Sequence, residues 1–356
     1  MIQTTLLPQA CLIDAVRAIE SSYRRMAIIV ANDGKLLGTL TDGDIRRSLL
    51  IGASLEDLAV KSMNPNPILA KEDYSEDHLK YLMRSGNIMA LPLVDKSGYF
   101  IRLIHFSDLG QAEIKNINNL NGFSFAVIMA GGEGTRLRPL TEFIPKPMLE
   151  IAGISLLARQ VQRLVDSGIN RIYISINYLG HVIEDFFADG SQFGAEIYYL
   201  REQFQLGTAG ALSLLPEKPE RSIIVMNGDI LSTFSFDGLY AFHREHMADV
   251  TVAAIDHKIN IPYGVITSSG SYVTDITEKP SERYLCNAGI YALSPEVLIL
   301  IPQKKHSNMT DLIGNCLENN RKVAVFPIHE YWSDIGTPEE LKNAREHFSK
   351  LHSFNL

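Results

Sequence analysis

The chain has 356 residues, apolar and charged fractions of 46% and 21%, and a formal net charge of −8. This length accommodates two domains, and the negative charge argues against a general nucleic-acid or anionic-membrane surface, so a phosphate ligand must be held by local basic residues. The cysteines Cys11, Cys286 and Cys316 are scattered without a CxxC pair, which excludes a disulfide framework and a cysteine zinc site. No stretch has the length of a membrane span, and charged residues such as Asp14 and Arg17 precede any signal-like apolar core. We therefore expect a cytoplasmic protein that binds neither membrane nor nucleic acid.

The N-terminal third of the chain, residues 1–109, contains two copies of one unit. Each copy has two short apolar strands joined by a turn, Asn32-Asp33-Gly34 in the first copy and Lys96-Ser97-Gly98 in the second. The elements predicted here are a helix over 12–19 and strands over 26–30, 36–40, 90–94 and 100–104. Since neither copy alone could bury its apolar face, we expect the two copies to share one core.

The segment LLGTLTDGDIRRSLLIG in the first copy resembles the cystathionine-β-synthase-type (CBS) domain family. In that family, Ser/Thr-x-x-Asp at the end of the second strand holds the ribose and phosphate of a nucleotide. The resemblance implies an adenine or guanine nucleotide site at Thr41 and Asp44, and a second one at Asp108, where His105 replaces the Ser/Thr. The alternative is that Asp44 caps the helix that follows.

A polar, Asn-rich segment without periodicity, residues 110–122, is predicted to link this region to the rest of the chain. We predict a small α/β CBS-pair domain over 1–115 and a second domain over 123–356. Strands and helices alternate from Phe123, as in an α/β fold with a doubly wound mixed sheet. The predicted strands are 125–130, 171–176, 195–200, 222–226, 250–255, 264–267 and 290–293, and the predicted helices are 154–165, 183–187, 309–318 and one opened by Thr337-Pro338.

The most informative stretch is FAVIMAGGEGTRLRPLTEFIPKPMLEIAG, residues 125–153. Its apolar run breaks into three closely spaced glycines, whose backbone N–H groups can approach an anion without obstruction by Cβ atoms. Arg136, Arg138 and Lys146 follow, so polyphosphate is the expected ligand. The spacing matches neither the P-loop, which needs a Lys-Ser or Lys-Thr, nor the dinucleotide fingerprint, where Leu137 stands in place of the third glycine.

GGEGTRLRPLT followed by PKPMLEIAG resembles the signature of the sugar-1-phosphate nucleotidyltransferases. Within that family, PKPMLEIAG and LGTAGAL are most similar to the mannose-1-phosphate/glucosamine-1-phosphate guanylyltransferase type. The resemblance implies a Rossmann-like nucleotidyltransferase domain. It also implies the reaction of a nucleoside triphosphate with a sugar 1-phosphate, which gives a nucleoside-diphosphate sugar and pyrophosphate with Mg²⁺ as cofactor. We expect a homo-oligomer.

The resemblance also implies roles for individual residues. Arg136 and Lys146 would be catalytic, Asp229 and Asp334 would hold the metal, and Glu202 would read the base, where a carboxylate favours guanine and hence GTP. The implied nucleotide-binding residues are Ala130, Gly131, Gly132, Gly134, Thr135, Glu202, Gly207, Thr208 and Gly228, and the implied sugar-binding residues are Tyr263, Gly264, Glu278, Lys279 and Asn287.

Three alternatives remain open at this point. Gln203 and Gln205 lie close to Glu202, and an amide suits uracil or thymine, so uridylyl or thymidylyl transfer is the first alternative. The second is a non-catalytic nucleotide-sensing regulator, and the third is a glycosyltransferase, although the chain has NGD rather than a DxD metal motif at residues 227–229.

Overall fold

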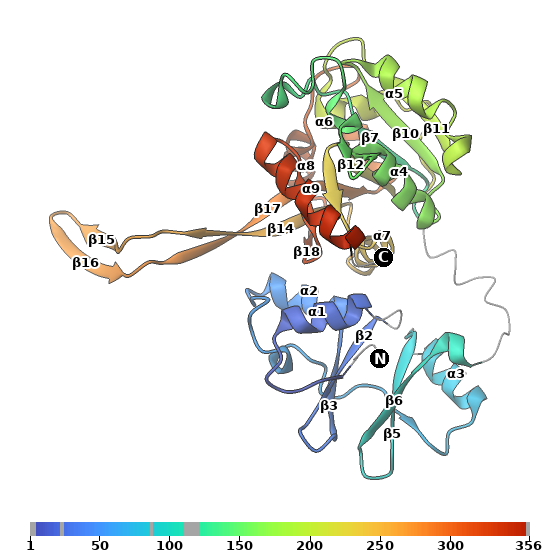
Figure 1. Ribbon diagram of the computed structural model, residues 1–356, viewed down its shortest axis with the longest axis vertical. Helices are drawn as coiled ribbons and strands as arrows, with labels where there is room; N and C mark the ends of the chain where they lie inside the picture. The colour runs from blue at the N-terminus through green and yellow to red at the C-terminus, as the bar shows by residue number, and fades with distance from the viewer. Residues whose placement is uncertain (1–4, 22–24, 86–87, 110–121, 354–356) are drawn as a thin grey trace. The chain divides into compact units, whose positions relative to one another are not determined.

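The computed structural model describes residues 5–21, 25–85, 88–109 and 122–353. The chain forms two compact units, Met1–Asn118 and Asn119–Leu356 (Figure 1). The predicted linker over 110–122 lies outside the described residues except for Gly122, so the predicted domain limits at 115 and 123 remain predictions. Among the described helices, none combines the length and the apolar character that crossing a bilayer requires.

The first unit contains two three-stranded sheets with the same topology. In each, a short parallel strand pairs with the first strand of a hairpin, in the orders β1-β2-β3 and β4-β5-β6. The elements are β1 Thr5–Leu6, α1 Leu12–Ser21, β2 Met26–Val30, β3 Leu36–Thr41, α2 Asp42–Leu50, β4 Ala70–Lys71, α3 Glu76–Ser85, β5 Ala90–Val94 and β6 Phe100–His105. The repeat predicted from the sequence is therefore present in the fold.

A small cluster of buried side chains joins the two repeats. Ile28 of β2 packs with Ala90 of β5 and Leu103 of β6. The two hairpin turns also meet, since the Leu36 amide donates to the Gly98 carbonyl oxygen at 3.1 Å and the Phe100 amide donates to that of Gly34 at 3.2 Å. As expected, the two copies bury apolar surface that neither could bury alone.

The second unit is built on a seven-stranded mixed sheet in the order β11-β10-β7-β12-β17-β14-β18, in which β17 runs antiparallel to its neighbours. The sheet strands are β7 Ala126–Met129, β10 Arg171–Ile176, β11 Glu196–Arg201, β12 Ile223–Asn227, β14 Val250–Asn260, β17 Ser281–Leu293 and β18 Val323–Ile328. Short pairs outside it are β8 Glu150–Ile151 with β9 Ile154–Ser155, β13 Ile230–Ser232 with β19 Trp332–Asp334, and β15 Val265–Ser269 with β16 Tyr272–Thr277. The helices are α4 Leu156–Asp166, α5 Gly180–Phe187, α6 Gly207–Gly210, α7 Phe236–Glu245, α8 Met309–Glu318 and α9 Pro338–Ser353.

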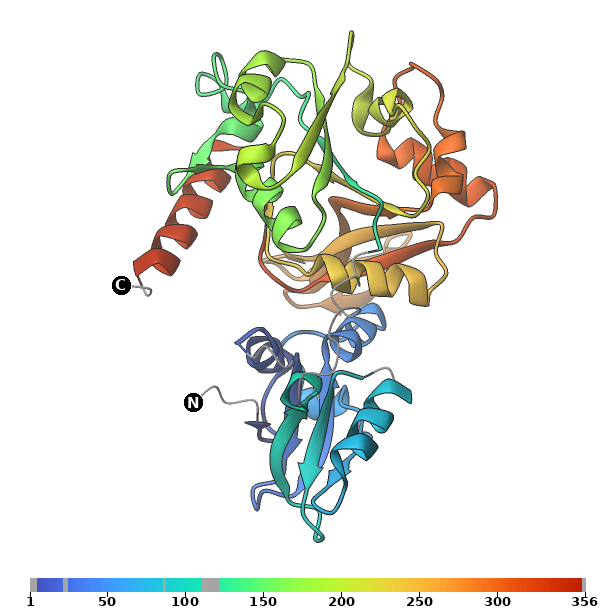
Figure 2. The same ribbon diagram turned by 90° about the vertical axis from the view of Figure 1, so that its right-hand side faces the viewer.

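Helices cover both faces of this sheet, as a doubly wound fold requires. On one face, Val127, Val225 and Tyr291 from three neighbouring strands pack in one cluster with Leu312 and Cys316 of α8. Figure 2 shows the green α4 and α5 on one side of the sheet and the orange α8 on the other. The predicted α/β fold with a mixed sheet is confirmed.

Local signals placed several element ends correctly. Gly168 follows the C-cap of α4 with φ 78°, and Thr337 caps α9, its hydroxyl accepting from the Glu340 amide at 3.3 Å. Three predictions were wrong in detail. Residues Ile154–Ser155 form β9, with Ser155 as the N-cap of α4, and the strands predicted at 250–255 and 290–293 are the inner ends of much longer strands.

His243 of α7 is buried in the second unit. Its Nδ1 lies 2.8 Å from the Thr251 hydroxyl, and its Nε2 lies 3.1 Å from that of Ser222 and 3.2 Å from that of Ser294. Burial lowers the pKa of His243 to about 4, against an opposing effect of Asp249. The neutral ring therefore belongs to the folded state.

We predict that the second unit loses stability between pH 6.5 and pH 4. In that range the unfolded chain binds a proton on His243 that the folded chain does not. The free energy of unfolding therefore decreases as the pH is lowered from 6.5 to 4, by on the order of 3 kcal/mol. Urea unfolding followed by the fluorescence of Trp332, the single tryptophan of the chain, measures this unit at each pH. His243→Gln should flatten the dependence, and an equal pH slope in both proteins would contradict the assignment.

Candidate active site

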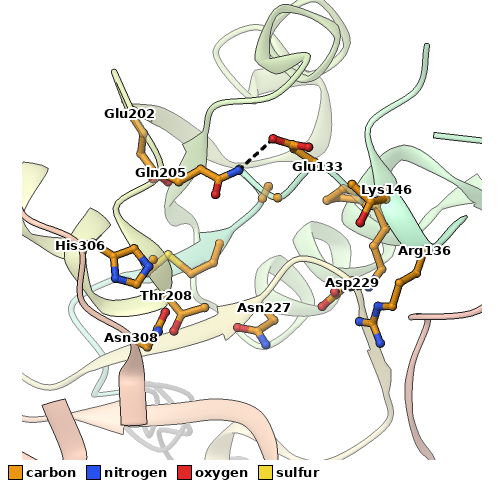
Figure 3. A pocket seen from close by; sticks show the side chains of 18 residues that line it. Glu133, Arg136, Lys146, Glu202, Gln205, Thr208, Asn227, Asp229, His306 and Asn308 are labelled. Atoms are coloured by element: carbon orange, nitrogen blue, oxygen red, sulfur yellow. Dashed lines mark hydrogen bonds and ion pairs between the residues drawn. The ribbon is translucent and has the colours of Figure 1, made fainter. Parts of the chain in front are cut away.

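A cleft of about 440 Å³ opens where β7 and β12 end (Figure 3). These strands are parallel neighbours, while β10, the next strand of this sheet along the chain, pairs with the other edge of β7. The chain therefore reverses direction across the sheet at this point, which is where open α/β sheets bind ligands. The lining residues are Met129, Ala130, Gly131, Gly132, Glu133, Gly134, Thr135, Arg136, Lys146, Pro147, Glu202, Gln205, Gly207, Thr208, Asn227, Asp229, His306 and Asn308.

The glycine loop that follows β7 forms one wall of the cleft. Gly134 has φ 61°, in the left-handed region, and a Cβ there would lie 3.0 Å from the Lys146 Cβ and 3.2 Å from Thr141 Cγ2. The Thr141 hydroxyl donates to the Gly134 carbonyl oxygen at 2.8 Å. By contrast, a Cβ on Gly132 would contact nothing within 4 Å. The third glycine of the loop is thus required by packing against the segment that carries Lys146.

Lys146 brings together the two carboxylates expected to hold a metal. Its ammonium group forms a short ion pair with Asp229 and lies 3.4 Å from Asp334 Oδ1. The two acids come from paired strand segments, since Asp334 of β19 is the register partner of Ile230, the residue after Asp229. Lys146 itself is only 8% exposed, so its charge needs these partners.

The donor set fits a divalent cation. Within the described part of the chain, the buried Asp229 Oδ1 has no hydrogen-bond partner. Burial raises the pKa of Asp334, and the nearby Asp229 raises it further, while Lys146 opposes both effects. Two carboxylates that destabilise each other's charge, one with an oxygen left over, are suited to Mg²⁺, which takes one or two carboxylates together with phosphate oxygens.

Arg136 reaches the same side of the cleft. Its guanidinium lies over Gly336, where an added Cβ would come within 3.1 Å of Nη2, and Gly336 follows Asp334 by two residues. Arg136 therefore lies beside Lys146 and Asp229 in the cleft (Figure 3), and its guanidinium adjoins the segment that carries Asp334. Arg138, in contrast, is half exposed and lies 3.8 Å from Glu133.

Glu202 lines the cleft, but its carboxylate also holds the neighbouring loop. It accepts from the Ser175 hydroxyl in a short hydrogen bond and from the Leu206 amide at 2.7 Å. Asn177 fixes the same residue by donating to its carbonyl oxygen at 2.8 Å. Each carboxylate oxygen can accept more than one hydrogen bond, so Glu202 can still accept hydrogen bonds from a nucleotide base. The contacts with Ser175, Leu206 and Asn177 fix its position.

The sequence analysis missed His306 and Asn308, which reach the cleft from a distant segment. That segment docks on α6: the Ala209 and Gly210 amides both donate to the Ser307 carbonyl oxygen at 2.9 Å. The Met309 amide donates to the Thr208 hydroxyl at 2.9 Å, and Gly207, with φ 77°, has no room for a Cβ beside Ser307. These contacts between residues far apart in sequence bring His306 and Asn308 into the cleft, and no local sequence pattern predicts them.

Gln160 of α4 is a further residue that the sequence analysis missed. Its side chain is buried, and its amide donates to the carbonyl oxygens of Asn227 at 3.0 Å and Ile230 at 2.7 Å. These carbonyls flank the turn that carries Asp229. Gln160 therefore holds the turn that carries Asp229 at both of its ends. Gly228 does not line the cleft; its amide donates to the Met129 carbonyl oxygen at 2.8 Å and joins the two strand ends.

The structure does not bring most of the predicted sugar-binding residues to the cleft. Tyr263, Gly264, Glu278 and Lys279 are exposed and lie on the long ribbon formed by β14 to β17. Asn287 lies at the base of the ribbon, where its amide donates to the Tyr291 hydroxyl at 2.8 Å. None of these five residues is among those that line the cleft, and a sugar-binding role for them stays a prediction.

In the first unit, Thr41 and Asp44 form a capping box at the start of α2. The Thr41 amide donates to Asp44 Oδ2 at 2.8 Å, and the Asp44 amide donates to the Thr41 hydroxyl at 3.3 Å. Asp108 accepts from the His105 amide at 3.0 Å in the second repeat. The capping role weighed for Asp44 is thus present, while a nucleotide site at these residues remains a prediction.

Comparison with known proteins identifies the class that this fold and site define. Residues 125–350 match the nucleotidyl transferase family, and residues 12–51 match the CBS domain. The first match covers more than half of the chain, which therefore belongs to the nucleotidyl transferase family.

Curated relatives are similar over the same extent. Mannose-1-phosphate guanyltransferase 2 of Candida glabrata is 33% identical over 225 residues, and mannose-1-phosphate guanylyltransferase of Mycobacterium tuberculosis is 34% identical over 223 residues. Each match covers 60% of this chain and 62% of the relative, so the chain spans less than two thirds of the length of these proteins.

Solved structures share the fold. HddC from Yersinia pseudotuberculosis is 29% identical with a TM-score of 0.50, over 63% of this chain and 98% of that chain. A putative glucose-1-phosphate thymidylyltransferase from Bacillus anthracis has a TM-score of 0.51 over 62% of this chain and 94% of that chain. The second is 22% identical and is a likeness of fold alone.

We predict that Gly134→Ala lowers the free energy of unfolding of the second unit by about 1–3 kcal/mol. A left-handed residue with a Cβ costs about 1–2 kcal/mol, and the contact with Lys146 adds to it. Gly132→Ala is the matched control and should change stability by less than about 0.5 kcal/mol. Urea unfolding followed by Trp332 fluorescence compares the two, and equal effects of both changes would contradict the role given to Gly134.

Proposed function

We propose that this protein transfers a nucleotidyl group from a nucleoside triphosphate, with GTP favoured, to a sugar 1-phosphate, and releases pyrophosphate. The observation that carries the proposal is the meeting of Lys146, Asp229 and Asp334 at one end of a cleft walled by the glycine loop. A basic residue between two acids, beside backbone amides suited to phosphate, is a site for polyphosphate chemistry.

The chemistry needs little proton transfer. A sugar 1-phosphate is already an anion, so its oxygen attacks the α-phosphorus without a general base, and catalysis rests on positioning and charge neutralisation. The amides of the glycine loop hold the triphosphate, Arg136 binds its β- and γ-phosphates and the leaving pyrophosphate, and Lys146 draws the two reacting phosphates together. Asp229 and Asp334 would hold Mg²⁺, which neutralises phosphate charge when bound.

The preference for GTP has two supports. Glu202 lines the cleft and presents a carboxylate, which suits the N1–H and 2-amino donors of guanine, and the curated relatives are named guanylyltransferases. One observation favours the alternative, uridylyl or thymidylyl transfer: the Gln205 amide also lines the cleft, 3.2 Å from Glu133. The names of the relatives make mannose 1-phosphate the first sugar to test.

The proposal predicts pyrophosphate release that requires both substrates. Four nucleoside triphosphates are combined with mannose, glucose and glucosamine 1-phosphates in the presence of Mg²⁺, and pyrophosphate is measured. The fastest release is expected with GTP. Faster release with UTP or dTTP selects the alternative, and no release with any pair leaves the nucleotide-sensing regulator.

The metal site gives a second prediction. Asp229→Asn keeps the shape of the side chain but removes one of two charges, so Mg²⁺-dependent turnover should fall at least about 100-fold while the protein stays folded. Asp237→Asn, at an acid in the first turn of α7 outside the cleft, is the matched control and should keep the wild-type rate. Unchanged turnover in Asp229→Asn would remove this residue from the metal site.

The first unit adds a proposed regulatory site for an adenine or guanine nucleotide at Thr41, Asp44 and Asp108. Asp44→Asn keeps an oxygen for the α2 cap but loses the charge, so the change in turnover caused by added AMP or GMP should shrink at least about threefold. Glu56→Gln, at an exposed acid of the same unit, serves as the control. An undiminished nucleotide response in Asp44→Asn would leave Asp44 as a helix cap alone.

A further inference from the structure

The ribbon formed by β14 to β17 leaves the second unit as a long arm, here defined as residues 256–285. Figure 1 shows β14 and β17 running side by side away from the body, with β15 and β16 at the tip. All residues of the arm are exposed except Ile261, Val265 and Pro280, which are half-buried. Since an isolated two-stranded ribbon is only marginally stable in water, an arm of this length needs a surface to pack against.

Near its base, one face of the ribbon carries apolar side chains together with His257 and Glu282. In the antiparallel ladder, Ile259 pairs with Glu282 and Ile255 with Cys286, and the alternation of strands places Tyr284 on the same face. The opposite face carries the Asp256–Arg283 ion pair. Nearer the tip, the cross-strand pair Ile266 and Ile276 is 60% and 62% exposed. Large apolar side chains such as Ile259, Ile266 and Ile276 that are exposed along a ribbon in a single chain are typical of a surface covered by a partner.

Four of the five predicted sugar-binding residues, Tyr263, Gly264, Glu278 and Lys279, lie together on this arm. A Cβ on Gly264 would lie 2.9 Å from Glu278 Oε2, so the Tyr263-Gly264 and Glu278-Lys279 segments are adjacent across the ribbon. In the described part of the chain, neither Glu278 nor Lys279 has a hydrogen bond or an ion pair, and Tyr263 is 75% exposed. An acid, a base and an aromatic ring on one short surface are groups that suit a sugar phosphate.

The arm cannot deliver these residues to its own cleft while its ladder is intact. The pairing continues from Ala254 and Asn287 at the base to Asn260 and Ser281, and the Ile261 amide then donates to the Pro280 carbonyl oxygen at 3.0 Å. Six residues of strand span about 20 Å. Return to the same cleft would break these hydrogen bonds, whereas contact with another molecule breaks none.

We propose that the arm packs against the nucleotidyltransferase unit of a second copy of this chain and carries Tyr263, Glu278 and Lys279 to the sugar end of that copy's cleft. Two copies that exchange arms make the same contact twice, which closes a twofold dimer. The part played by the sugar rests on the proposed function, whereas the dimer contact does not. The cleft of one copy then supplies the nucleotide and metal residues, and the arm of its partner supplies the sugar residues.

Paired variants in defined heterodimers test the exchange. One chain carries Asp229→Asn, the other carries Glu278→Ala with Lys279→Ala, and two affinity tags isolate the mixed dimer. Each parent alone should have less than about a tenth of the wild-type rate of pyrophosphate release, and the mixed dimer should regain about half, because one of its two sites is intact. No gain over the parents, or an arm variant as active as the wild type, would overturn the proposal.

The reverse arrangement is the control. A dimer of one wild-type chain with one chain that carries all three changes should be inactive, since the intact cleft faces the altered arm. If the arm served its own cleft, this dimer would keep about half of the wild-type rate. The two mixed dimers therefore give opposite results for the two arrangements.

A measurement without turnover separates the arm from the proposed function. The wild-type chain should sediment as a dimer, and Ile266→Ser with Ile276→Ser should weaken the dimer at least about tenfold. Ile299→Ser, at an 83% exposed residue outside the arm, is the matched control. If no substrate pair releases pyrophosphate, these results still decide the arm contact: a wild-type monomer, or arm variants that sediment like the wild type, would overturn it.

Discussion

The ammonium group of Lys146 holds the second unit's site together. It neutralises two carboxylates that come from segments 83 and 188 residues away in sequence. A charge as buried as this one is stable only beside opposite charge, so the three segments must meet for the unit to fold. Folding and the assembly of the site are therefore the same event, and the glycine loop, packed on the Lys146 segment through Gly134, is fixed by it.

Much of the fold could be predicted from the sequence, because its signals are local. Apolar runs of strand length predicted β2 and β10 to the residue, and helical spacing with a polar start predicted α8. The long glycine and lysine motif pointed to one edge of the sheet, and the structure places Arg136, Lys146, Asp229 and Asp334 together there. Motif order along the chain was sufficient because parallel strands end at a common edge.

The remainder depends on contacts that no local pattern encodes. His306 and Asn308 enter the cleft because amides near α6 donate to the Ser307 carbonyl oxygen, and nothing in either segment announces the other. The arm was missed for a different reason. Its paired strands, residues 256–260 and 281–285, are mostly polar and show no periodic apolar pattern, so the sequence does not indicate that the strands continue so far from the core.

The short pairing of β13 with β19 sets the distance between the two acids through the backbone. Leu231 of β13 and Ile335 after β19 share a buried cluster with Leu341 and Ala344 of α9. A change in the packing of that helix would shift one carboxylate relative to the other without touching either. Under the proposed function, the affinity for Mg²⁺ should thus respond to hydrophobic substitutions in α9 that leave every polar group of the cleft unchanged.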